Sequence, residues 1–104
     1  MPKFILVFDE VMLKQLKKAG KNNQVRAILA KMLDRLEESG PEAGSLLDSH
    51  LFMYELRCKH PPIRLYYRHK IVTDEIYVFE YELKTSKEKQ NETIQKIRKK
   101  ILKS

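Results

Sequence analysis

Residues 51–83 read LFMYELRCKHPPIRLYYRHKIVTDEIYVFEYEL, and this stretch decides the fold. Apolar and polar side chains alternate along three successive runs in it, the period expected of strands with one dry and one wet face. His60-Pro61-Pro62 separates the first run from the second, because proline cannot donate to a strand ladder and restrains the residue before it. Thr73 and Asp74 turn the second run into the third. The stretch therefore predicts an antiparallel three-stranded meander.

The two faces of these strands are expected to differ in chemistry. One face is apolar and predicts a core, to which the third run contributes Tyr77, Phe79, Tyr81 and Leu83. The other face gathers three arginines and three glutamates, which are Arg57, Arg64, Arg68, Glu55, Glu80 and Glu82. Because charged side chains converge there, the functional site is expected on this second face.

Before the meander, the sequence predicts one strand and two helices. Residues 4–8 (FILVF) form a continuous apolar run, typical of a strand buried on both faces or near the centre of a sheet, although the strand can join the sheet either at an edge or between the others. Asp9 is placed to cap a first helix, which Gly20 can close in the left-handed conformation. Asn22 or Asn23 begins a second helix with a regular apolar stripe, made of Val25, Ile28, Leu29, Met32, Leu33 and Leu36.

After the second helix, Gly40 and Pro41 predict a break, and residues 40–49 are expected to form a loop under the sheet edge. Beyond the meander, Thr85 with Glu88 matches a capping box, and a final basic helix carries a narrow stripe of Ile94, Ile97 and Ile101. The order of elements predicts one α+β domain over residues 1–104, with helices on one face of the sheet and the other face free.

Composition narrows the class of protein. The chain has a net charge of +7, and its last fifth holds eight basic residues against two acidic ones, which suits a polyanionic partner or a solvated basic helix. Cys58 is the only cysteine, so no internal disulfide can form, and its place in the pattern indicates a core thiol rather than a nucleophile or metal ligand. The apolar run at residues 4–8 is too short for a signal peptide or a membrane span, so a cytoplasmic protein with no membrane contact is expected.

Three sequence pieces carry a resemblance to a known family. They are YELR at 54–57, IRLYY at 63–67 and YELKTSK at 81–87, followed by the basic helix. Their order and separation resemble the RelE/ParE superfamily of bacterial toxins, and most closely its phage-derived HigB-like branch. The resemblance runs over nearly the whole chain.

The resemblance implies the toxin of a type II toxin–antitoxin system, a metal-independent endoribonuclease that cuts messenger RNA in the ribosome and needs no cofactor or metal. A ribose 2′-hydroxyl would attack the adjacent phosphate, which requires a base, cations around phosphorus and an acid for the departing 5′-oxygen. Arg64 matches the family arginine that faces the scissile phosphate, and its fork suits two phosphate oxygens. Lys84 matches a family lysine and is expected to contact phosphate, with Lys87 as an outer helper.

The chain also departs from the family pattern, and the general base stays open. Leu83 stands where the family often has a lysine, and no tyrosine follows Tyr81. Two side chains are candidates for the base: His60, whose intrinsic pKa suits the task, and Glu55, which lies where RelE has lysine and the HigB-like branch has glutamate.

Three further residues of the charged face are candidates for RNA binding, each with a structural alternative. Arg57 would contact RNA or, more simply, pair with Glu55 or Glu80 across strands. Tyr66 would stack on a splayed base or cover the stem of Arg57 or Arg68, and Arg68 would extend the cationic surface.

Two other functions share the same fold. A ParE-like inhibitor of DNA gyrase needs no catalytic side chains, and a decayed toxin would survive as a non-catalytic binding partner. In each case the expected partner is a cognate antitoxin, usually a helix-turn-helix protein encoded by the adjacent gene in HigB-like systems. For the nuclease, messenger RNA and the ribosome are further expected partners.

Overall fold

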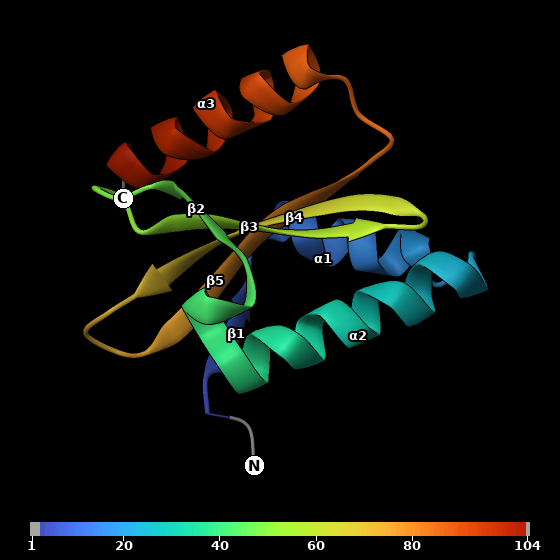
Figure 1. Ribbon diagram of the computed structural model, residues 1–104, viewed down its shortest axis with the longest axis horizontal. Helices are drawn as coiled ribbons and strands as arrows, with labels where there is room; N and C mark the ends of the chain where they lie inside the picture. Colours follow the sequence, from blue (N-terminus) through green and yellow to red (C-terminus); the bar gives the residue numbers. More distant parts are fainter. Residues whose placement is uncertain (1–2, 104) are drawn as a thin grey trace.

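The computed structural model describes residues 3–103 of the chain. Its elements in order are β1 (Ile5–Phe8), α1 (Glu10–Ala19), α2 (Asn23–Ser39), η1 (Gly40–Ala43), β2 (Ser45–Asp48), β3 (Met53–Lys59), β4 (Pro62–Lys70), β5 (Glu75–Leu83) and α3 (Lys87–Lys103) (Figure 1). The predicted α+β class and the order of the predicted elements are confirmed. The short strand β2, which falls in the expected loop, is an addition.

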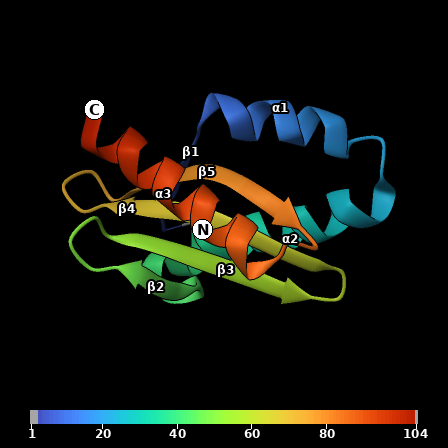
Figure 2. The same ribbon diagram turned by 90° about the horizontal axis from the view of Figure 1, so that it is seen from above.

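The five strands form one sheet in the order β1-β5-β4-β3-β2 (Figure 2). The strand β1 pairs parallel to β5, and all the other pairs are antiparallel. The expectation that residues 4–8 are buried on both faces is wrong, because β1 is an edge strand whose Ile5 is 65% exposed. The helices α1 and α2 lie on one face of the sheet and α3 on the other, so the prediction of a free face is also wrong (Figure 1).

Local side-chain chemistry sets the helix ends. Asp9 caps α1 by accepting from the Val11 N–H, and Asn22 caps α2 by accepting from the Val25 N–H, as predicted. Gly20 adopts the right-handed conformation, contrary to expectation, whereas Gly40 has a φ of 54° where α2 stops.

The cap of α3 also differs from the prediction. The hydroxyl of Ser86, not that of Thr85, accepts from the backbone N–H three residues on, which belongs to Lys89. The Thr85 hydroxyl instead accepts from the side chain of Gln90. Ser86 is therefore the N-cap residue, and Lys89 cannot complete a capping box because its side chain has no acceptor.

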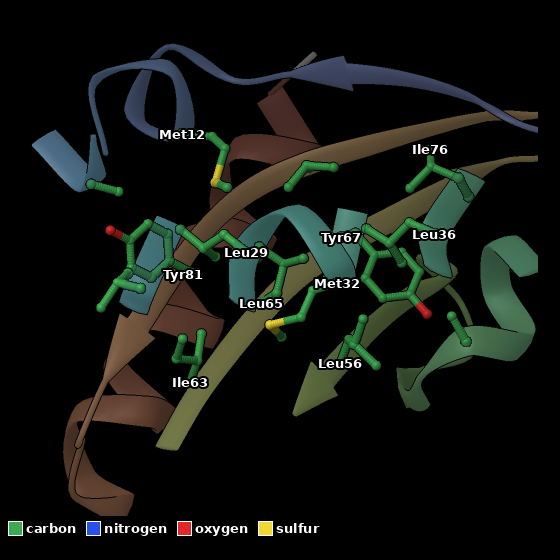
Figure 3. Packing of buried hydrophobic residues seen from close by; sticks show 14 residues of the cluster. Met12, Leu29, Met32, Leu36, Leu56, Ile63, Leu65, Tyr67, Ile76 and Tyr81 are labelled. Carbon is green, nitrogen blue, oxygen red and sulfur yellow. The ribbon is translucent and has the colours of Figure 1, made fainter. Parts of the chain in front are cut away.

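The main core lies between α1, α2 and the sheet (Figure 3). The apolar stripe of α2 contributes Leu29, Met32 and Leu36 to it, as the helical spacing predicted. The sheet contributes Leu56, Ile63, Leu65, Tyr67, Ile76, Val78 and Tyr81. Burial of these side chains is the dominant favourable term for the fold.

A bulge breaks the alternation of β5. Leu65 pairs with Tyr81 and Tyr66 with Glu80, but Tyr67 pairs with Val78, so Phe79 is the extra residue. The predicted grouping of Tyr77, Phe79, Tyr81 and Leu83 on one face is consequently wrong. Tyr81 joins the main core, whereas Tyr77 and Phe79 lie with the second core under α3.

The second core consists of Met53, Tyr66, Phe79, Ile97 and Ile101. Tyr66 was expected on a wet face, yet it is fully buried, so its ring is not available to stack on a base. Its hydroxyl donates to Glu82 Oε1 at 2.7 Å, and the Thr93 hydroxyl donates to Glu82 Oε2 at 2.6 Å. One buried carboxylate thus joins the sheet to α3 through two neutral donors.

Ion pairs add to this docking. Lys96 Nζ lies 3.1 Å from Glu80 Oε1, Arg98 Nε 3.0 Å from Asp48 Oδ2, and Lys100 Nζ 2.9 Å from Asp9 Oδ2. For Asp9, burial by itself raises the pKa of the carboxyl, but hydrogen bonds from Lys100, Val11 and Tyr77 lower it below its usual value. The basic charge of α3 is therefore partly matched by carboxylates elsewhere in the fold.

Replacing Thr93 by valine removes one donor from the buried Glu82 carboxylate while keeping the shape of the side chain. We expect the free energy of unfolding to fall by about 1–3 kcal/mol, the cost of leaving a buried acceptor unsatisfied, measured by urea denaturation. Thr73→Val, at an exposed turn, is the control and should change stability by less than about 0.5 kcal/mol. Equal losses in the two variants would show that the bond to Glu82 does not hold α3.

Candidate functional site

A cleft of about 840 Å³ lies at the end of the sheet where β4 begins and β5 ends. It is lined by parts of α2, η1, β2, β3, β4 and β5, by the segment after β5 and by the first turn of α3. The lining residues are Arg35, Ala43, Gly44, Ser45, Glu55, Leu56, Arg57, Cys58, Lys59, Pro62, Ile63, Arg64, Glu82, Lys84, Thr85 and Gln90. Five of these side chains are basic and two are acidic. The cleft therefore attracts anions.

Gly44 allows close packing of the chain along one side of the cleft. A Cβ atom there would overlap the backbone carbonyl of Glu55 and lie 2.7 Å from the Tyr67 hydroxyl. Because glycine has no Cβ, η1 and β2 can pack directly against β3, and the Tyr67 hydroxyl donates to the Gly40 carbonyl at 3.3 Å. This contact fixes the α2 end of the cleft relative to the strands.

The carboxylate of Glu55 lies between two arginines. Its Oε2 accepts from Arg64 Nη1 at 2.9 Å, and its Oε1 lies 3.6 Å from Arg57 Nε. The side chain of Glu55 is only 9% exposed, whereas those of Arg64 and Arg57 are 27% and 57% exposed. Glu55 thus anchors two guanidinium groups that remain accessible from the cleft. Arg57 pairs with Glu55 as expected, but the two residues lie on the same strand, β3, and not across strands.

Lys84 enters the cleft from the segment after β5. Its backbone has a φ of 45°, and its N–H donates to the carbonyl of Pro62 at 3.1 Å. This bond holds the end of β5 against the start of β4, where Arg64 is located. The two cations that were predicted to contact phosphate therefore line the same cleft.

Glu82 connects the cleft with α3. It lines the cleft and is the cross-strand neighbour of Arg64, while its two oxygens accept from Tyr66 and Thr93. Burial, and then the hydrogen bond to Glu82, raise the pKa of Tyr66 well above its usual value. Tyr66 therefore stays protonated at neutral pH and supports Glu82 as a donor.

Four of the predicted site residues lie outside this cleft. His60 is exposed in the turn between β3 and β4, and Lys87 is exposed at the first position of α3. Tyr66 is buried under α3, and Arg68 lies at the other end of β4 beside a second pocket. Arg64, Lys84, Glu55 and Arg57 are the predicted residues that the fold brings together.

The cleft also contains residues that the sequence did not single out. Arg35 comes from α2, and its Nη2 donates to the Ala43 carbonyl at 3.2 Å. Lys59 and Gln90 are two more, whereas Glu82 was already expected on the charged face from the alternation along its strand. Nothing in the helical pattern distinguishes Arg35 from other exposed basic residues.

Residues 3–103 offer neither a cluster of metal ligands nor a membrane-spanning helix. In this part of the chain no cluster of three or more histidine, cysteine, aspartate or glutamate side chains could hold a metal ion. None of the helices there has the length and apolar character to cross a bilayer.

Comparison with known proteins gives matches at the level of structure. No family model and no curated protein sequence matches the chain. A free-state variant of the Escherichia coli toxin RelE, with two arginines replaced by alanine, is 28% identical at a TM-score of 0.68, over 93% of this chain and 99% of that one.

Two toxin–antitoxin complexes are also similar. The chain in the intact E. coli RelBE complex is 27% identical at a TM-score of 0.65, with 80% of this chain and 99% of that chain covered. The chain in the RelBE2 complex of Mycobacterium tuberculosis is 16% identical at a TM-score of 0.65, covers 83% of this chain and 97% of its own, and shows the fold alone. Together with the three ordered sequence pieces, the likeness to the E. coli proteins shows that this chain belongs to the RelE/ParE superfamily.

Proposed function

We propose that this protein is the toxin of a type II toxin–antitoxin system and that it cleaves messenger RNA on the ribosome, in the cytoplasm. The observation that carries the proposal is the cleft lined by Arg64, Arg57 and Lys84, in which the buried carboxylate of Glu55 pairs with both arginines. Its structural neighbours in E. coli are the toxin RelE and the RelBE toxin–antitoxin complex. A cognate antitoxin is the corresponding partner here. The placement of this chain in the HigB-like branch stays a prediction.

The proposed reaction is an internal phosphoryl transfer. A ribose 2′-oxygen forms a bond to phosphorus while the bond from phosphorus to the 5′-oxygen breaks, leaving a 2′,3′-cyclic phosphate and a 5′-hydroxyl. Arg64 and Lys84 stabilise the charge that develops on the phosphate oxygens. No metal or cofactor takes part in this proposal, and the departing 5′-oxygen takes its proton from solvent water in the open cleft.

Glu55 is the better placed of the two candidate bases. Its carboxylate lines the cleft and is 2.9 Å from the guanidinium of Arg64, so a 2′-hydroxyl next to a phosphate held by Arg64 would come close to it. His60 is exposed in the β3–β4 turn and does not line the cleft. We therefore assign proton abstraction to Glu55.

The nuclease activity is tested by expression of the chain from an inducible promoter, with primer extension on a translated messenger. The parent should arrest growth and create new 5′ ends, and Arg64→Ala should lower cleavage by about 10²-fold or more, because it removes the main stabilising cation. Arg26→Ala, which removes an exposed arginine of α2 outside the cleft, is the control.

Growth arrest without new 5′ ends, undiminished in Arg64→Ala, would contradict the nuclease proposal. A DNA supercoiling assay with purified gyrase would then test the ParE-like alternative. Full tolerance of the parent protein, together with tight binding to the product of the neighbouring gene, would indicate a decayed toxin.

The identity of the base is tested by Glu55→Gln and His60→Gln in single-turnover cleavage on programmed ribosomes. Glu55→Gln keeps the shape and an acceptor for Arg64 but cannot take a proton, so the rate should fall by about 10²–10⁴-fold. His60→Gln should retain the parental rate. The reverse pattern would assign the base to His60.

Arg35 tests whether the whole cleft binds the RNA strand. Arg35→Gln removes a cation from the α2 side, and we expect weaker binding to single-stranded RNA with a salt dependence reduced by about one phosphate contact. Arg26→Gln makes the same change of charge elsewhere on α2 and should leave the salt dependence at the parental value. Matching curves for the two variants would show that RNA does not reach Arg35.

A further inference from the structure

A second pocket, of about 380 Å³, lies beneath the C-terminal part of α3. It is lined by Asp9, Arg68, Lys70, Tyr77, Phe79, Lys100 and Ile101. Arg68 is four residues beyond Arg64 on β4, which corresponds to about 13 Å at about 3.3 Å per residue, so this pocket is separate from the cleft at the other end of the strand. Its volume is within the range of sites that hold small ligands.

The charges in this pocket are unevenly matched. Its lining has three cations and one carboxylate, Asp9, which already accepts from Lys100, Val11 and Tyr77. None of the ion pairs found among residues 3–103 involves Arg68 or Lys70. The pocket therefore holds positive charge that no carboxylate of the described chain neutralises.

Arg68 and Lys70 also have donors to spare. The Nε atom of Arg68 is buried and has no hydrogen-bond partner among residues 3–103, which is unusual for a buried polar group and indicates a missing acceptor. The ammonium of Lys70 lies 5.2 Å from the centre of the Tyr77 ring, so its charge is held over the pocket by an aromatic face. An anionic ligand with several acceptor oxygens would satisfy both groups.

We propose that this pocket is a second phosphate-binding site, which takes a phosphodiester of a nucleic acid strand. A guanidinium fork and a neighbouring ammonium group together can bind the several oxygens of a phosphate more fully than the two oxygens of a single carboxylate. The rings of Tyr77 and Phe79, 5.0 Å apart, give the same pocket an apolar wall for a sugar or base, which an isolated phosphate or an acidic peptide would leave unused. The site is independent of the cleavage proposed above, since Arg64 and Glu55 take no part in it.

Inorganic phosphate is the first probe, and its binding to the full chain is measured from the backbone amide shifts in NMR spectra. We expect saturable shifts at Arg68, Lys70 and Tyr77 in the parent and in Arg64→Ala, and a loss of at least tenfold in affinity in Arg68→Gln. Because Arg68 is partly buried, Lys70→Gln, at an exposed position, is the second variant and should weaken binding without affecting thermal unfolding. Lys31→Gln, on the exposed side of α2, is the control of equal charge.

A short single-stranded RNA and a polyglutamate peptide of equal charge distinguish the sources of the anion. RNA should bind more tightly than inorganic phosphate, and Lys70→Gln should reduce its salt dependence by about one contact relative to Lys31→Gln. Shifts that do not saturate, equal effects in Lys70→Gln and Lys31→Gln, or polyglutamate binding as tight as RNA would each overturn the proposal. If Arg64→Ala loses cleavage but keeps these shifts, phosphate binding at this pocket is independent of the nuclease activity.

Discussion

The fold depends on strand β4 being buried on both of its faces. Tyr67 points into the core under α1 and α2, and its neighbour Tyr66 points into the core under α3. Both side chains are fully buried, and each hydroxyl donates a hydrogen bond to a residue far away in the sequence. Tyr67 donates to the Gly40 carbonyl and Tyr66 to the Glu82 carboxylate. Because successive residues of a strand face opposite sides, this one dipeptide contributes to the cores on both faces of the sheet, and Arg64 lies two residues before Tyr66 on the same strand.

The elements that local pattern controls could be predicted from the sequence. The apolar stripe of α2, the caps Asp9 and Asn22 and the three strands of the meander follow from spacing and side-chain chemistry. The strand β2 could not, since four residues with no clear alternation form a strand only because β3 offers a partner. The bulge at Phe79 depends in the same way on packing against α3.

The burial of the second face was missed for a related reason. The stripe on α3 has only three isoleucines, and the rest of its attachment is polar: Thr93 bonds to the buried Glu82, and Lys96 pairs with Glu80. Such residues read as solvent-exposed in a sequence, because their partners are far away in the chain. The same distinction applies to the candidate site. The shared face of Arg64, Glu55 and Arg57 could be predicted from strand alternation, whereas the position of Arg35 depends on how α2 ends against β3.

The pairing of Glu55 with Arg64 is compatible with a phosphate in the cleft. A carboxylate and a phosphate compete for the same guanidinium, so an ion pair that used all of its donors would exclude a phosphate. A guanidinium, however, has five N–H donors, and only Nη1 of Arg64 donates to Glu55. In the proposed reaction, the remaining donors would hold a phosphate while Glu55 keeps Arg64 in place. The buried carboxylate would then serve two roles with one geometry: it would orient the cation that holds the phosphate, and it would take the proton of the attacking hydroxyl.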